Sequence, residues 1–115
     1  MKKFLVLYLA PVAVVDEWKK KPEAERKGEE EKMMGEWKQW MSAHAKDFAD
    51  LGAGAGKTKR VTAQGAADAR NDVMMYALVQ AESHDAAAKL FVDHPHFQIP
   101  QASIEVMEIN ALPPA

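Results

Sequence analysis

The stretch that decides the fold is Asn71–Glu82, with the sequence NDVMMYALVQAE. Side chains of an extended strand alternate between two faces. One face here carries Val73, Met75, Ala77, Val79 and Ala81, and the other carries Met74, Tyr76, Leu78 and Gln80. Both faces are apolar, whereas a strand with one solvated face alternates apolar with polar residues. The pattern therefore predicts a strand that is covered on both sides.

Lys3–Leu9 has the same character, with Phe4, Val6 and Tyr8 on one face and three leucines on the other. We expect it to lie beside the strand at 72–81, in the centre of a sheet. A basic start followed by an apolar run is also typical of a secretory signal peptide. Pro11 interrupts the run and Asp16 and Glu17 follow it at once, which favours the strand.

A helix is predicted from Pro22, whose fixed φ suits a first turn. Its apolar face carries Trp37, Met41, His44 and Phe48, flanked by Met33, Trp40 and Leu51, and its opposite side carries Glu36, Lys38, Gln39 and Lys46. The glycines of Leu51–Gly56 should end the helix.

We expect an edge strand at Lys57–Ala63, because charge discourages unwanted pairing at sheet edges, and then a loop over Gln64–Arg70.

The second half of the chain predicts another helix and a last strand. Ser83 can cap the helix, whose apolar stripe is Ala87, Leu90 and Phe91, and Pro95 ends it. Ser103–Asn110 forms the strand.

The order is therefore strand, helix, strand, strand, helix, strand. It predicts an α+β, ferredoxin-like βαββαβ fold, in which a four-stranded antiparallel sheet has both helices on one face. The first and third strands should be central. The other face needs cover, because monomers rarely expose large apolar patches, so we expect a homodimer through the open sheet face, forming a dimeric α+β barrel.

Composition narrows the functional classes. The 115 residues form one expected domain, 1–115, and the net charge of −2 gives no field that would recruit nucleic acid or an anionic membrane. The absence of cysteine excludes disulfides and thiolate chemistry. Leu51 stands where a phosphate-binding loop needs its first glycine, so nucleotide binding is not expected. We expect a cytoplasmic protein without a cofactor.

His44 is a candidate general acid or base, because imidazole titrates near neutral pH and this residue lies on the apolar face of the long helix. The alternative is a buried histidine that is hydrogen-bonded to the protein. Asp72, Asp47 and Glu105 are the candidate carboxylate partners, and the sequence does not choose among them.

His94-Pro95-His96 offers two more imidazoles. Two histidines and a carboxylate suit zinc or non-haem iron, but this spacing in a loop is a weak signal and we expect no metal. His96 should instead line a ligand pocket. We expect that pocket to include Tyr8, Trp37, Trp40, His94 and Phe97.

Three stretches, MKKFLVLYLAP, ESHDAAAKLFVDHP and HPHFQIPQASIEVMEI, together resemble the YCII-related (DGPF-like) family over about residues 2–110. The most specific part is His94–Phe97 followed by Ser103–Val106. The resemblance implies a dimeric α+β barrel of ferredoxin-like halves, and in some members a His–Asp pair in a cleft beside the sheet. The DGPF tetrapeptide is absent, and only Asp72 lies near its position.

Two functions follow as hypotheses. In the first, the chain is a small-molecule enzyme in which His44 or His96 acts as general acid or base, with Asp72 as a partner. In the second, it is a non-catalytic dimeric module that binds a small ligand or regulates a partner.

Overall fold

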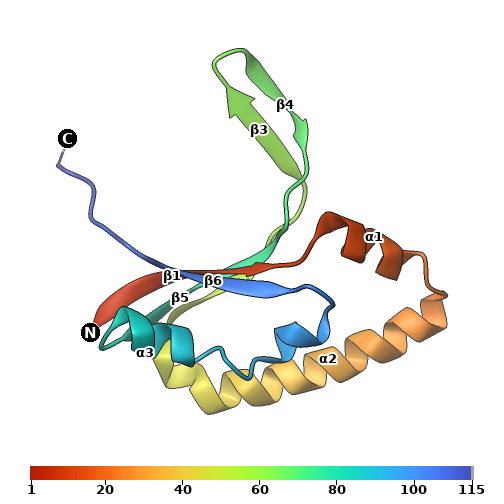
Figure 1. Ribbon diagram of the computed structural model, residues 1–115, viewed down its shortest axis with the longest axis horizontal. Helices are drawn as coiled ribbons and strands as arrows, with labels where there is room; N and C mark the ends of the chain where they lie inside the picture. The colour runs from red at the N-terminus through yellow and green to blue at the C-terminus, as the bar shows by residue number, and fades with distance from the viewer. Residues whose placement is uncertain (115) are drawn as a thin grey trace.

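The computed structural model describes residues 1–114 of the chain (Figure 1). In chain order the elements are β1 (Lys2–Leu9), α1 (Val12–Lys19), α2 (Glu23–His44), the 3₁₀ turn η1 (Ala45–Asp47), β2 (Phe48–Gly54), β3 (Thr58–Thr62), β4 (Gly65–Ala69), β5 (Val73–Ala81), α3 (His84–Lys89), the 3₁₀ turn η2 (Pro95–Gln98) and β6 (Ser103–Glu108).

The main sheet has four strands in the order β2-β5-β1-β6, and all of its neighbours are antiparallel. The two strands predicted to be central are β1 and β5, and they pair along their length. Leu7 of β1 lies opposite Tyr76 of β5 and Glu105 of β6. The predicted α+β fold with a four-stranded antiparallel sheet is therefore confirmed.

One face of this sheet carries the core. Its fully buried residues are Phe4, Val6, Tyr8, Ala77 and Val79, and the helix side adds Ala87 and Phe91. Trp37 and Trp40 of α2 pack against the same cluster. Both α2 and α3 therefore lie on this face, as predicted (Figure 1). The predicted cap of α3 is also confirmed, because Ser83 Oγ accepts a hydrogen bond from the amide of Ala86.

The predicted end of the long helix is wrong. The helix ends at His44, and Phe48 and Leu51 lie in β2 at the sheet edge. The glycines permit close contact with β5: Gly52 has φ +74°, and a Cβ there would be 1.7 Å from the carbonyl oxygen of Tyr76. The pairing of β2 is irregular at this point, as expected where a glycine lets one backbone approach another.

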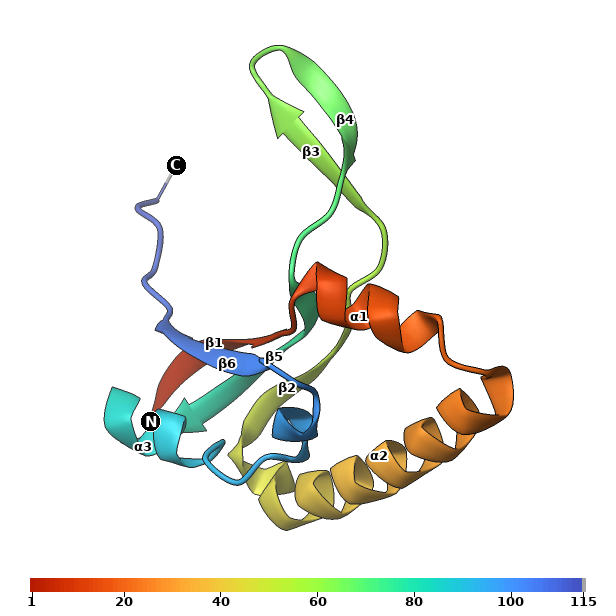
Figure 2. The same cartoon turned by 45° about the vertical axis from the view of Figure 1, so that its right-hand side comes forward.

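The strand predicted at Lys57–Ala63 is present as a strand at Thr58–Thr62, but its predicted place at the edge of the main sheet is wrong, and so is the loop predicted to follow it. Thr58–Thr62 forms β3, which pairs with β4 in a separate hairpin. This hairpin projects from the sheet on the side away from α2 (Figures 1 and 2). Val61 near its tip is 77 % exposed. Charged and small residues suit a solvated hairpin as well as a sheet edge, so composition does not distinguish the two.

The face of the sheet opposite the helices is apolar and open; we call it the open face. It carries Leu5, Leu7, Tyr76, Leu78 and Met107, which lie in register across three strands, and Glu105, which lies opposite Leu7. Tyr76 is 40 % exposed, and no helix or strand within residues 1–114 covers this face.

The molecule is extended for its mass. Its surface of 8264 Å² exceeds the value of about 6,300 Å² expected for a folded monomer of 12.8 kDa. Its radius of gyration is 16.2 Å, against about 13 Å for a compact chain of this length. In the part of the chain that the structure describes, no helix has the length and hydrophobicity needed to cross a membrane.

Candidate functional site

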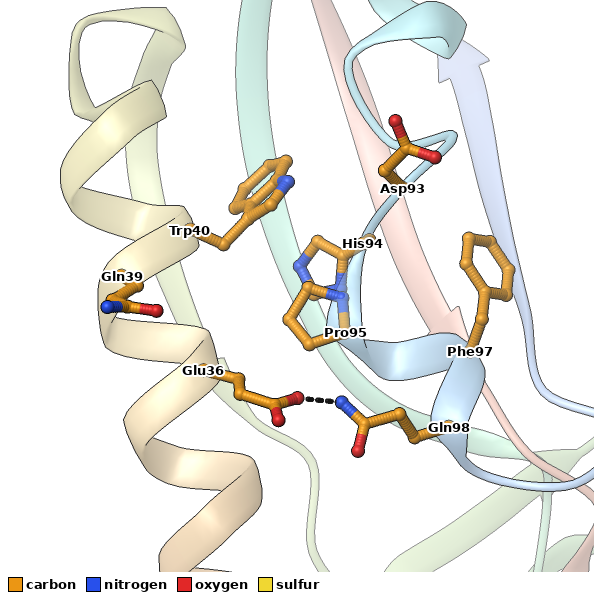
Figure 3. A pocket seen from close by; sticks show the side chains of 8 residues that line it. All are labelled: Glu36, Gln39, Trp40, Asp93, His94, Pro95, Phe97 and Gln98. Carbon is orange, nitrogen blue, oxygen red and sulfur yellow. Dashed lines mark hydrogen bonds between the residues drawn. The ribbon is translucent and has the colours of Figure 1, made fainter.

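A groove of about 630 Å³ opens where α2 faces the segment Asp93–Gln98 (Figure 3). Glu36, Gln39 and Trp40 line it from α2, and Asp93, His94, Pro95, Phe97 and Gln98 line it from the opposite side. A second groove of about 640 Å³ lies where α2 passes β5. Its lining is mostly apolar: Met34, Trp37, Lys38, Met41, Ser42 and Met75.

Local sequence fixes the conformation of His94. Because Pro95 follows it, the residue adopts extended geometry, with φ −67° and ψ 139°. Its Nδ1 then accepts a hydrogen bond of 2.9 Å from the backbone N–H of His96, which caps η2. An acceptor nitrogen carries no proton, so the neutral ring has its proton on Nε2.

His94 is almost completely buried, with 3 % of its surface exposed. Burial is the main cause that lowers the pKa of the imidazole to about 3, and the neighbouring imidazoles of His96 and His44 lower it further. His94 is therefore neutral at physiological pH. Its Nε2 is buried without a hydrogen-bond partner among the described residues.

Tyr8 approaches the same place from β1. Its ring centroid lies 5.2 Å from that of His94 and 5.1 Å from that of Trp37. Burial raises the pKa of the Tyr8 phenol, so the hydroxyl stays protonated. Within residues 1–114 this hydroxyl, like Nε2 of His94, is a buried polar group without a hydrogen bond. Two such groups in neighbouring side chains are unusual, because buried polar atoms are normally paired.

Two indoles of α2 complete the cluster. Trp37 lies 4.5 Å and Trp40 lies 4.3 Å from His94, measured between ring centroids. Four of the five predicted ligand-binding residues thus meet in one cluster. The fifth, Phe97, lines the groove and is 45 % exposed, and it lies on the other side of His94 from Trp40 (Figure 3).

His44 is the last residue of α2, and its imidazole stacks on Trp40 with ring centroids 4.2 Å apart. Of the three candidate carboxylates, Asp47 is the one nearby, with Oδ2 3.7 Å from Nδ1 of His44. Asp72 instead accepts a hydrogen bond from the amide of Val12 at the start of α1. Glu105 lies in β6, opposite Leu7, and is exposed.

His96 holds the turn against the sheet. Its side chain is buried, and Nε2 donates a hydrogen bond of 2.8 Å to the carbonyl of Leu9 at the end of β1. Burial is the main cause that lowers the pKa of this imidazole. The catalytic roles expected for His44, His96 and Asp72 stay predictions.

Sequence reasoning missed the polar wall of the groove. Glu36 and Gln39 were assigned to the solvated side of the helix, but both line the groove, and Glu36 accepts a hydrogen bond from the side-chain amide of Gln98 across it (Figure 3). The position of η2 beside this helix face depends on the path of the chain after α3. Helical spacing alone carries no signal of that contact.

Comparison of the sequence with protein-family models and with curated proteins found no match. Within the described residues, no three His, Asp or Glu side chains gather in an arrangement suited to a metal ion. A functional proposal therefore rests on the geometry of the groove and on the resemblance of residues 2–110 to the YCII-related family.

Proposed function

We propose that the protein is a dimeric, YCII-like protein that binds a small molecule in the groove between α2 and Asp93–Gln98. One observation carries this proposal: the groove wall contains His94, whose neutral ring has a buried donor at Nε2 that no described residue uses. Leaving a buried donor unsatisfied costs free energy. A ligand that accepts this hydrogen bond would recover that cost.

The strand order supports the family assignment. If the β3–β4 hairpin is an insertion, the order β2-β5-β1-β6 fits the proposed ferredoxin-like sheet, and the helices α2 and α3 share one face. His94–Phe97 belongs to the most specific part of the resemblance; three of its residues, His94, Pro95 and Phe97, line the groove, and His96 is buried.

Two observations support a homodimer through the open face. This face is apolar across three strands, and the monomer exposes roughly 2,000 Å² more than a compact chain of its mass. A stable interface buries about 800 Å² per partner, which is less than this excess, to which the projecting β3–β4 hairpin also contributes. A second copy, stacked sheet to sheet, would give each chain the cover that its own helices give to the other face.

A fragment screen tests the ligand-binding function. Uncharged and charged aromatic fragments would be added to ¹⁵N-labelled protein, and we expect hits that shift the amides of 93–98 and the indole of Trp40. Gln39→Trp fills the groove from α2 and should abolish these shifts. Lys32→Trp, on an exposed part of the same helix, is the matched control. A screen without hits at the groove would overturn the proposal.

A second candidate, the enzyme hypothesis, is favoured by the His44–Asp47 pair. A carboxylate beside an imidazole orients the ring for proton transfer. His44 is partly exposed and touches Trp40, which lines the groove. If groove ligands are converted, His44→Gln should reduce turnover by roughly 10²-fold or more and leave binding intact. Equal turnover in wild type and variant would exclude His44 as the general acid or base.

A further inference from the structure

Two buried polar atoms indicate the chemistry of a ligand: Nε2 of His94, a residue of the groove wall, and the hydroxyl of Tyr8, whose ring lies beside that of His94. Both atoms are fully buried and make no hydrogen bond within residues 1–114. They belong to side chains whose rings lie 5.2 Å apart, and both rings contact Trp37. They come from β1 and from the turn before η2, so the fold brings together two donors that are distant in sequence.

The proton positions restrict the partner of this pair. Nδ1 of His94 is occupied by the amide of His96, so Nε2 is a donor and cannot accept. The phenol of Tyr8 keeps its proton and can donate as well. Two neutral donors in neighbouring side chains are suited to one oxygen acceptor with two lone pairs, such as a carbonyl.

The surroundings restrict the rest of the ligand. Glu36 and Asp93 line the groove and no Lys or Arg does, so its charged lining is acidic. A carboxylate or phosphate would be repelled there and would have to lose its hydration. Trp40, Pro95 and Phe97 offer flat apolar surfaces, which favour a planar, apolar body.

We propose that the groove binds an uncharged, planar molecule through a carbonyl oxygen that accepts hydrogen bonds from Nε2 of His94 and the hydroxyl of Tyr8. This assignment rests on the proposed ligand-binding function and names its ligand class. Trp37 and Trp40 lie against His94. Both donors are closed to solvent in this structure, so the proposal includes a displacement of Trp40, which lies against His94 and lines the groove.

Three probes of similar size test this ligand class: acetophenone has the carbonyl, ethylbenzene lacks the oxygen, and benzoate carries a charge. Their dissociation constants would be measured by NMR titration of the full chain, following the ¹⁵N signal of Nε2 in His94 and the indole of Trp40. We expect acetophenone to bind roughly tenfold or more tightly than either analogue, which corresponds to about 1.4 kcal/mol.

Two conservative variants locate the effect. Tyr8→Phe removes one donor and no other atom, and should weaken acetophenone binding severalfold without changing ethylbenzene binding. Tyr76→Phe makes the same change on the open face and should change neither. Because Tyr8→Phe removes a hydroxyl without a partner, the variant should fold at least as well as the wild type, and its unfolding curve verifies this.

The outcomes separate the ligand class from the proposed function. Equal binding of acetophenone and ethylbenzene, or tighter binding of benzoate, overturns the carbonyl assignment. Shifts confined to the methyl groups of Met34, Met41 and Met75 place the probe in the second groove and also overturn it. If none of the three probes binds, the carbonyl assignment fails, whereas fragments that still bind beside Trp40 leave the proposed function standing.

Discussion

The two faces of the main sheet are made by the same strands and meet different conditions. On β1, Phe4, Val6 and Tyr8 are buried under α2 and α3, whereas Leu5 and Leu7, which alternate with them, are only partly covered. Both sets are equally apolar in sequence. The difference teaches that hydrophobic patterning predicts that a face needs cover, but not whether the cover belongs to the same chain.

This contrast has a thermodynamic consequence. Cover by α2 and α3 is intramolecular, so its contribution to stability does not depend on protein concentration. Cover of the open face by a second copy contributes by mass action and fails on dilution. Each of the following experiments compares a variant of the covered face with one of the open face or with another exposed position. The faces should differ in how stability depends on protein concentration or on their buried polar groups.

The largest expected effect is that of Phe4→Ala, which removes a buried ring from the covered face. We expect the unfolding free energy to fall by about 3–5 kcal/mol, because the ring leaves a cavity. Denaturant unfolding at several protein concentrations measures it. Leu5→Ala, one residue away on the open face, is the matched control. The loss of unfolding free energy that it causes should increase with protein concentration. If the two variants share one concentration dependence, the two faces do not differ in how they are covered.

The next largest effect is that the folded protein loses stability at acid pH, because the covered side of the molecule buries the neutral imidazole of His94. The pKa of His94 is lowered from 6.5 to about 3 in the folded protein, so below pH 6.5 the unfolded chain binds a proton that the folded chain does not. Stability is therefore complete above that pH and falls by about 1.4 kcal/mol per pH unit for this one histidine as the pH drops towards 3.

Denaturant unfolding between pH 8 and pH 4.5 measures this loss, which should reach about 3 kcal/mol at the acid end from His94 alone. His94→Phe should flatten the curve, although the lowered pKa of His96 leaves part of the slope. His84→Gln changes an exposed histidine and should keep the full slope. A wild-type curve that stays level across this range would contradict a buried, neutral His94.

A charge on the open face should separate the proposed dimer without unfolding the chain. Leu5→Lys places an ammonium in the middle of this face, between Leu78 and Met107, once on each copy. We expect the dimer dissociation constant to rise roughly 100-fold, because a buried anchor is replaced by an unpaired charge. Sedimentation equilibrium measures the constant. Val92→Lys, at an exposed residue after α3, is the control. A wild type that is monomeric at all concentrations would remove the dimer from the proposal.

The smallest effect comes from a single oxygen atom. Tyr8→Phe removes the buried hydroxyl from the covered face, and Tyr76→Phe removes a partly exposed one from the open face. The first change should raise the unfolding free energy by about 1 kcal/mol, because an unsatisfied polar group no longer has to be buried. The second should change it by a few tenths at most. Calorimetry compares them, and a loss of stability in Tyr8→Phe would mean that this hydroxyl has a partner in solution.

The strands and the cluster of aromatic residues could be predicted because alternation and helical spacing are local signals. Val79 and Phe4 belong to such patterns, and so do Trp37 and Trp40. The end of α2 could not be predicted in the same way. Phe48 continues the helical spacing, but it reaches the core through η1 and β2. Nothing in the residues around Gly52 indicates that a carbonyl of β5 lies where a Cβ would be.

The candidate site shows the same limit. His94 and Tyr8 could be named as pocket residues from the sequence, but the roles of their polar atoms depend on neighbours. The proton on Nε2 follows from a backbone amide two residues away, and the missing partner follows from packing against α2. Glu36 belongs to the groove because η2 lies beside that helix face, a contact between residues 62 positions apart.

The central position of β1 also shapes how the chain acquires its structure. β1 pairs with β5 and β6, and Phe4 lies opposite Glu108, so both neighbours of this strand are distant from it in sequence. Contacts of such long sequence separation form slowly, and an unpaired apolar strand is prone to aggregate meanwhile. Productive folding thus depends on keeping β1 apart from other unfolded chains until β5 and β6 reach it.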